Sequence, residues 1–216
     1  MTGVTASLTA LLCALAALAL TRRMRILADS DSRWLRSGFH VLLAAVGGVG
    51  AALLSDGLAE LATYGLLAVA FALLVTIDLA AYRLPDLFVL PLYPLVFVGL
   101  LAAAAMSGDW SALGRAVLAG AALLAFYFLL ALINPSGLGL GDVKLSGVMG
   151  MFLGWLGWPA VLAGTLAAFI LNAVVAVTLL AARRVDAKSG IPFGPAMVVG
   201  AAAGAAYWTW RTSALA

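Results

Sequence analysis

The sequence predicts an all-α, polytopic helical membrane protein. Hydrophobic residues make up 65% of its 216 residues, and only 10% are charged. The mean hydropathy is +1.15, so the chain has more apolar surface than a soluble domain could bury. A membrane-spanning helix needs about 20 mostly apolar residues. The apolar runs are long and show no alternation, which argues against a closed β-barrel. We expect eight membrane segments, near residues 4–20, 39–55, 61–77, 87–105, 112–133, 143–156, 158–182 and 194–210.

These segments leave too little chain for a separate soluble domain, so a single integral-membrane domain over residues 1–216 is expected. The first segment has no basic residue before its apolar run, which is typical of a retained helix and not of a cleaved leader. Segment 143–156 is the weakest, because it is short enough to be tilted or re-entrant. The longest loop is expected over residues 21–38, with an interfacial helix that rests Trp34 and Leu35 on the membrane.

Basic residues are concentrated in every second loop. All lysines and arginines except Arg115 and Arg211 fall in the odd-numbered loops. This asymmetry is the positive-inside pattern, which places the odd loops in the cytoplasm and both termini outside. The net charge of +3 therefore reflects topology, and we expect a multi-pass protein of the inner or plasma membrane with no nucleic-acid partner.

The first polar motif runs from Asp78 to Asp86, where an apolar run ends at Ile77. Pro85 disfavours helix for the residue before it, so Asp86 is expected to be the N-cap of the next helix. Capping does not explain Asp78, which stands at the C-terminal end of a helix, where the helix dipole disfavours a negative charge. The structural alternative for Asp78 is an ion pair with Arg83.

The second polar motif is Gly139-Leu-Gly-Asp142-Val-Lys144, and it follows the helix that Asn134-Pro135-Ser-Gly137 ends. Its glycines allow close backbone approach. A nucleotide loop is excluded, because no strand precedes the motif and the Gly-Lys-Ser/Thr ending is absent. We expect Lys144 to stabilise an ionised carboxylate nearby or to contact a substrate acid. The structural alternative is a solvated turn capped by Asp142.

Charge counting places Asp78 and Asp142 on the same, cytoplasmic membrane face, with two helices between them. Bundle packing can bring such helix ends together. Two carboxyls that share a site do not easily both ionise, so one holds a proton while the other is charged. That state suits hydrolysis, in which the charged member takes a proton from water and the neutral one donates to a peptide carbonyl. The sequence therefore predicts a catalytic pair.

Other chemistry finds less support. Cys13 is the only cysteine, which excludes an internal disulfide and a thiolate metal site. His40 is the only histidine and is expected to be structural. A metal would need carboxylate ligands alone, so neither a metal nor a cofactor is expected. A third block, Ile191-Pro-Phe-Gly-Pro195, starts the last helix or lines a cleft for an unwound substrate; the cleft candidates are Pro192, Phe193, Gly194 and Pro195.

Taken together, the three blocks resemble those of type IV prepilin peptidases, and they occur in the same order over roughly residues 60–210. The stretch Asp78…Leu84-Pro85-Asp86, followed by Pro91, is similar to that family's first motif, and Gly139 to Lys144 is similar to its GxGD motif. The resemblance implies an intramembrane aspartyl peptidase in which Asp78 and Asp142 are catalytic. We expect supporting roles for Pro85, Asp86, Gly139, Gly141 and Lys144.

The resemblance further implies a prepilin or pseudopilin substrate, whose short basic leader is removed after a glycine at the cytoplasmic edge of the lipid bilayer. The apolar helix of the substrate then remains for assembly. Long members of the family carry a cysteine-rich insert after the first helix and also methylate the new N-terminus. Loop 21–38 has no cysteine, so a peptidase-only member without S-adenosylmethionine is expected.

Two alternatives remain. A polytopic transporter or pilus-assembly scaffold would use its acidic residues without catalysis, but such proteins place polar groups near helix midpoints, and these helices are almost free of them. Relatives of signal-peptide peptidase share Gly-x-Gly-Asp, but they place the partner aspartate in a Tyr-Asp motif, which is absent here.

Overall fold

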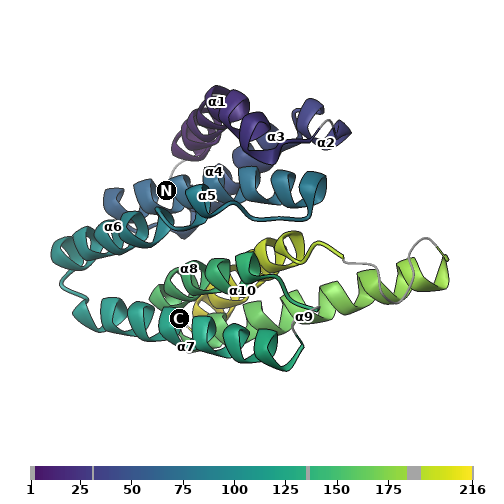
Figure 1. Cartoon of the computed structure of the whole chain (residues 1–216). Coiled ribbons are helices and arrows are strands. Elements are labelled where there is room, and N and C mark those ends of the chain that lie inside the picture. The colour runs from purple at the N-terminus through teal and green to yellow at the C-terminus, as the bar shows by residue number, and fades with distance from the viewer. Residues whose placement is uncertain (1–2, 31, 135–136, 184–190, 216) are drawn as a thin grey trace. The chain divides into compact units, whose positions relative to one another are not determined.

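The computed structural model describes residues 3–30, 32–134, 137–183 and 191–215, and all the regular structure in these ranges is α-helical (Figure 1). This confirms the all-α prediction. The chain divides into two compact units, Met1–Leu113 and Gly114–Ala216. The helices are α1 (Gly3–Ala28), α2 (Arg33–Arg36), α3 (Phe39–Leu54), α4 (Leu58–Ala81), α5 (Asp86–Val89), α6 (Leu92–Ser107), α7 (Trp110–Ile133), α8 (Leu140–Leu156), α9 (Trp158–Ala181) and α10 (Gly194–Leu215).

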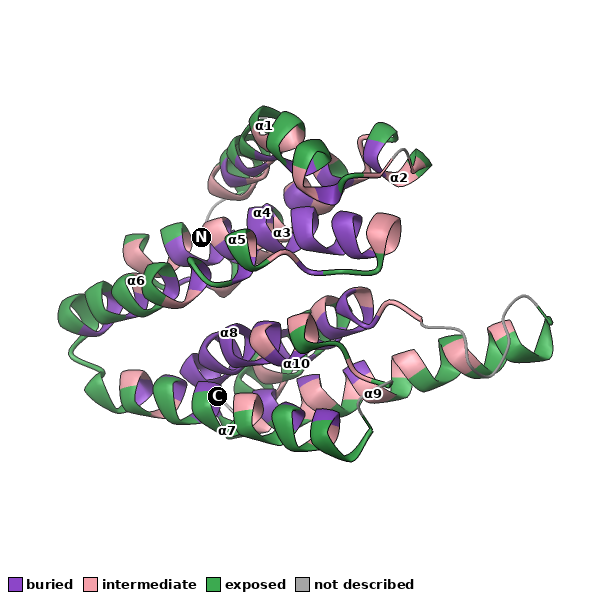
Figure 2. Cartoon of the chain, in the orientation of Figure 1, coloured by how far each residue is buried: buried purple, intermediate pink, exposed green. Residues whose placement is uncertain are grey.

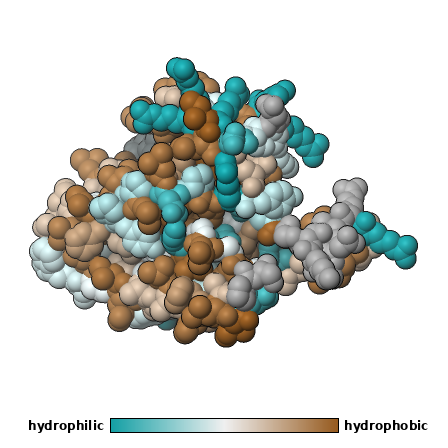
Figure 3. Space-filling view, in the orientation of Figure 1, coloured by the Kyte–Doolittle hydropathy of each residue, from teal (hydrophilic) through white to brown (hydrophobic). Residues whose placement is uncertain are grey.

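Five stretches of the described chain are long and apolar enough to cross a membrane. They are α1, α4, the stretch Asp86–Ser107 that holds α5 and α6, α7 and α9. The segments expected at 39–55, 143–156 and 194–210 also form helices, α3, α8 and α10, which are not among these five. The long helices carry exposed leucine, valine and phenylalanine, and hydrophobic residues cover much of the visible surface (Figure 3).

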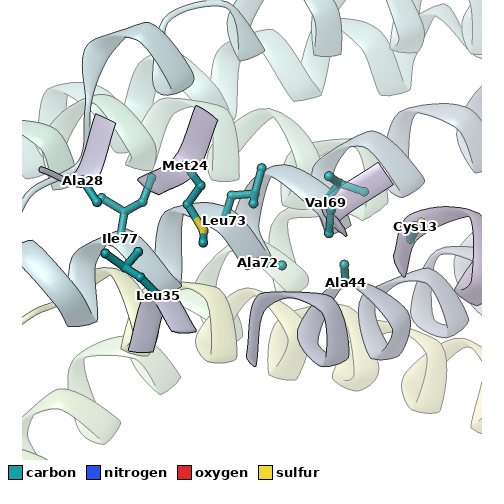
Figure 4. Packing of buried hydrophobic residues seen from close by; sticks show 10 residues of the cluster. Cys13, Met24, Ala28, Leu35, Ala44, Val69, Ala72, Leu73 and Ile77 are labelled. Carbon is teal, nitrogen blue, oxygen red and sulfur yellow. The ribbon is translucent and has the colours of Figure 1, made fainter. Parts of the chain in front are cut away.

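In the first unit, α4 is the central helix. It contacts α1, α2, α3 and α6, and nearly all its residues from Thr63 to Asp78 are buried (Figure 2). Its side chains meet those of α1, α2 and α3 in one apolar cluster (Figure 4), formed by Cys13, Ala17, Met24, Ala28, Leu35, Ala44, Val69, Ala72, Leu73 and Ile77. Small residues let these helices approach closely, as is usual in bilayers: a Cβ added at Gly48 of α3 would lie 2.9 Å from Ala10 Cα of α1.

The first loop is shorter than expected. Helix α1 continues to Ala28, so the first three arginines after its apolar run lie on the helix. The short helix α2 follows, but Leu35 is only 1% exposed and belongs to the apolar cluster. The expectation that Leu35 rests on the membrane was therefore wrong. The reason is tertiary: Arg25 Nε donates to the Leu35 carbonyl at 3.1 Å, which holds α2 against α1. Trp34 is half-buried.

In the second unit, α8 is the central helix, and every residue from Leu145 to Leu156 is buried. It lies against α7, α9 and α10. A Cβ at Gly150 of α8 would lie 2.5 Å from the Ala119 carbonyl oxygen of α7. Helices α9 and α10 meet through the small residues at 200–204, where a Cβ at Gly204 would lie 2.5 Å from the Ala160 carbonyl oxygen. Glycines thus allow close packing of α8 against α7 and of α10 against α9.

Candidate active site

Asp78 lies in the last turn of α4. The helix continues to Ala81, beyond the apolar run that ends at Ile77, so Asp78 stands at the C-terminal end of a helix, as predicted. Leucine and alanine follow Asp78, and both favour helix, which explains the extension. The Asp78 carbonyl accepts a hydrogen bond from the Tyr82 N–H at 2.9 Å. The Asp78 residue is only 4% exposed. A carboxyl buried at the negative end of a helix dipole is costly, so its retention favours a chemical role.

The loop after Asp78 makes a sharp turn. Tyr82 adopts a left-handed conformation (φ 53°, ψ 38°), and Leu84 is buried. The Arg83 guanidinium donates to the carbonyls of Leu27 and Ala28 at 3.0 and 2.9 Å. Pro85 is the N-cap of α5, and Asp86 is its exposed first residue, so the expected N-cap role of Asp86 was displaced by one position. The locked φ of Pro85 supplies the extended cap geometry in place of a side-chain cap.

Asp142 lies in the first turn of α8. Gly139 is the N-cap, and its backbone N–H donates to Asp142 Oδ2 at 3.3 Å. This is the carboxylate half of a capping box, and the helix dipole there favours negative charge. A Cβ at position 139 would lie 3.2 Å from Asp142 Oδ2, so glycine leaves room for the contact. Gly141, Asp142 and Lys144 are half-buried, whereas Pro135 and Ser136 of the preceding loop lie outside the described residues.

The two aspartates therefore stand at opposite kinds of helix end. Asp78 is at the C-terminal end of the central helix of its unit, and Asp142 is at the N-terminal end of the central helix of the other. The helix dipole disfavours an ionised carboxylate at the first end and favours it at the second. An acid–base pair requires such a contrast, because one carboxyl must hold a proton while the other is charged. Their expected approach to one another stays a prediction.

The third block starts the last helix, as expected. Gly194 is the first residue of α10, and Phe193 before it is 6% exposed. The Phe193 ring lies 5.3 Å from that of Phe169 and 6.1 Å from that of Tyr127, so it packs among aromatic residues of α7 and α9. A cleft role for Pro192, Phe193, Gly194 and Pro195 stays a prediction.

Two serines near the aspartates were not singled out from the sequence. Ser30 Oγ donates to the Ala80 carbonyl at 3.2 Å, two residues after Asp78 in α4. Ser146 Oγ, one turn after Asp142, donates to the carbonyls of Val143 at 2.7 Å and Leu123 of α7 at 3.2 Å. A serine just beyond a helix end is a weak sequence signal, because its partner is decided only by tertiary packing.

His40 is structural, as predicted. It is 1% exposed, and its Nε2 is hydrogen-bonded to Thr21 Oγ1 at 2.8 Å, which joins α3 to α1. No group of three or more His, Cys, Asp or Glu side chains that could hold a metal ion occurs within the described ranges.

The fold and motifs together define a helical membrane protein with a buried aspartate ending one central helix and a Gly-x-Gly-Asp sequence starting another. Residues 65–181, more than half of the chain, match the Type IV leader peptidase family, and the chain belongs to that family. The matched residues include both aspartates.

Curated relatives agree with this assignment. The chain is 32% identical to the prepilin leader peptidase/N-methyltransferase of Stutzerimonas stutzeri over 142 residues, which cover 64% of this chain and 45% of that protein. The protein of the same name from Aeromonas salmonicida is 34% identical over 146 residues (65% and 46%). That from Burkholderia pseudomallei strain K96243 is 32% identical over 152 residues (67% and 46%). The matches thus span less than half the length of these relatives. No solved structure is significantly similar to the chain.

Proposed function

We propose that this protein is an aspartic endopeptidase that removes the leader of prepilin-like precursors, with Asp78 and Asp142 as its catalytic pair. The observation that carries the proposal is that both aspartates lie within the family match and stand at the ends of the two most buried helices. A central helix is rigidly held by its neighbours, which is how a site keeps a reacting group in place.

The chemistry needs one ionised and one protonated carboxyl. The ionised carboxylate takes a proton from water while the water oxygen bonds to the peptide carbonyl carbon, and the neutral carboxyl gives its proton to the carbonyl oxygen. The tetrahedral diol then collapses: the C–N bond breaks, the amine nitrogen takes the collected proton, and the second carboxyl regains its own from the diol.

The charge asymmetry supports a cytoplasmic location for this pair, with both termini outside and α3, α8 and α10 completing eight membrane segments. The substrate is then a prepilin or pseudopilin whose helix leaves the bilayer of the inner membrane beside the pair. Its basic leader would reach the site from the cytoplasm. Further support for the membrane setting comes from the five long apolar stretches.

We expect Asp78→Asn and Asp142→Asn each to lower leader removal by about 100-fold or more, because each deletes one acid–base function. The measurement is the size of a co-expressed prepilin on a gel, with Asp56→Asn as the matched control, since Asp56 is an exposed aspartate of the second loop. Continued processing by both variants would refute the catalytic pair and favour the transporter or scaffold alternative.

The N-terminus of the cleaved pilin shows whether the protein also transfers a methyl group. The relatives are named as methyltransferases too, whereas the residues between α1 and α3 contain no cysteine. We propose peptidase activity without methyl transfer. The mass of the new pilin N-terminus should correspond to a free amine; a mass increase of one methyl group that depends on this chain would contradict that.

A further inference from the structure

Side chains join the C-terminal ends of α1 and α4 reciprocally. Arg83, which follows α4, donates from Nη2 to the Leu27 and Ala28 carbonyls of α1 at 3.0 and 2.9 Å. Ser30, which follows α1, donates from Oγ to the Ala80 carbonyl of α4 at 3.2 Å. The last four carbonyls of a helix have no partner within it. Each helix therefore has terminal carbonyls capped by the segment that leaves the other helix.

The backbone between Asp78 and Arg83 turns sharply at Tyr82. Tyr82 ends α4 in the left-handed region, with φ 53°. For a residue other than glycine this conformation is disfavoured, because Cβ comes too close to the following carbonyl oxygen. It persists where the surroundings determine it, and such residues cluster at functional sites. Here the turn lets Arg83 reach back to α1.

The backbone on both sides of Asp78 is held in place, in the region where the C-terminal ends of α1 and α4 are joined. Its own carbonyl is bonded to the Tyr82 N–H at 2.9 Å, and Ala80 lies two residues further along the same turn. On its other side, Ile77 belongs to the buried cluster that includes Ala28 of α1 and Leu35 of α2 (Figure 4). A shift of the last turn of α4 relative to α1 would therefore move the Asp78 carboxyl.

We infer that Arg83 and Ser30 are positioning residues for Asp78, so that the C-terminal end of α1 forms part of the working enzyme. This rests on the proposed catalytic role of Asp78. Helix α1 lies outside the residues matched to the family, 65–181. Its C-terminal end then contributes to activity as well as to packing. A displacement of about 1 Å in a reacting group can cost roughly 100-fold in rate.

The test uses the full purified chain in lipid nanodiscs with a synthetic prepilin, and it measures kcat and KM separately. Arg83→Gln should lower kcat by about 10- to 100-fold and leave KM within about twofold, because the substrate is still bound but Asp78 is misplaced. Arg83→Lys should recover part of the loss, since an ammonium can still donate to one carbonyl. Ser30→Ala should lower kcat less, and its effect should not multiply with that of Arg83→Gln, because both act on one joint.

Arg23→Gln is the matched control, since it removes the same charge from an exposed position on α1, and it should leave kcat unchanged. A raised KM with unchanged kcat in Arg83→Gln would overturn the inference, because it would make Arg83 a substrate contact. If Arg83→Gln fails to fold, Ser30→Ala decides: a folded Ser30→Ala chain with wild-type kcat also overturns it. Asp78→Asn distinguishes failure of this inference from failure of the proposed function, because an active Asp78→Asn chain refutes the catalytic role of Asp78 itself.

Discussion

Arg115 shows at the residue scale why one cation breaks the charge asymmetry. Its Nε donates to the Gly154 carbonyl at 2.7 Å and its Nη2 to the Trp155 carbonyl at 2.8 Å. These carbonyls belong to the last turn of α8, where helical partners are lacking. The Arg115 side chain therefore caps a central helix. Its position is explained by this contact and does not count against the predicted topology.

Replacing Arg115 by leucine should lower the free energy of unfolding by roughly 2–3 kcal/mol, because two buried carbonyls lose a charged donor. Thermal unfolding in detergent measures this. Arg211→Leu is the control, as a half-buried arginine of α10, and it should change stability by no more than about 0.5 kcal/mol. Equal effects of the two substitutions would show that Arg115 does not cap α8.

Individual residues were predictable to the extent that their roles are local. The Gly-x-x-Asp spacing from Gly139 to Asp142 is a capping pattern, and the structure has the carboxylate contact that the capping alternative anticipates. Leu35 was misplaced because its burial depends on α1 and α4, which are distant in sequence. Asp86 was displaced by one position because Pro85 takes the cap.

At the element scale, glycines decide which helices approach closely. Gly48 and Gly50 lie two residues apart on α3, but only a Cβ at Gly48 would meet backbone, 2.9 Å from both Ala10 Cα and the Thr9 carbonyl oxygen. Nothing lies within 4 Å of a Cβ at Gly50. The glycines of segment 39–55 therefore include one, Gly48, whose lack of a side chain lets α1 pack closely against α3.

Gly48→Ala should therefore lower the free energy of unfolding by roughly 1–3 kcal/mol through overpacking. Gly50→Ala should be neutral or raise it by up to about 1 kcal/mol, because alanine favours helix over glycine. Chemical or thermal unfolding of both variants measures the difference. A destabilisation of the same size at Gly50 would contradict the close approach of α1 and α3.

The helices themselves were well predicted, because each apolar run is long and bounded by polar residues. Their ends were not. Helix α1 runs to Ala28 and α4 to Ala81, beyond the apolar runs that end near residues 20 and 77. Side chains of Arg83 and Ser30 cap these extensions, and hydropathy alone carries no signal for such partners.

At the scale of the whole molecule, the membrane class and the family are established, and the meeting of two carboxyls is the proposal on which the function depends. Charge asymmetry and loop counting predict that both aspartates lie at one membrane face. Each unit then presents its aspartate at the end of its central helix. Only a measurement that spans both units tests the pair itself.

That measurement is cross-linking in a Cys13→Ala chain, which lacks other thiols. Asp78→Cys with Asp142→Cys should be joined within one chain by a short bifunctional thiol reagent, and added prepilin should slow the reaction. The pair Asp56→Cys with Asp142→Cys is the control and should not react, because positive-inside counting places these residues on opposite faces. Failure of the 78/142 pair to cross-link in a folded chain, or equal reaction of the control pair, would contradict the shared active site.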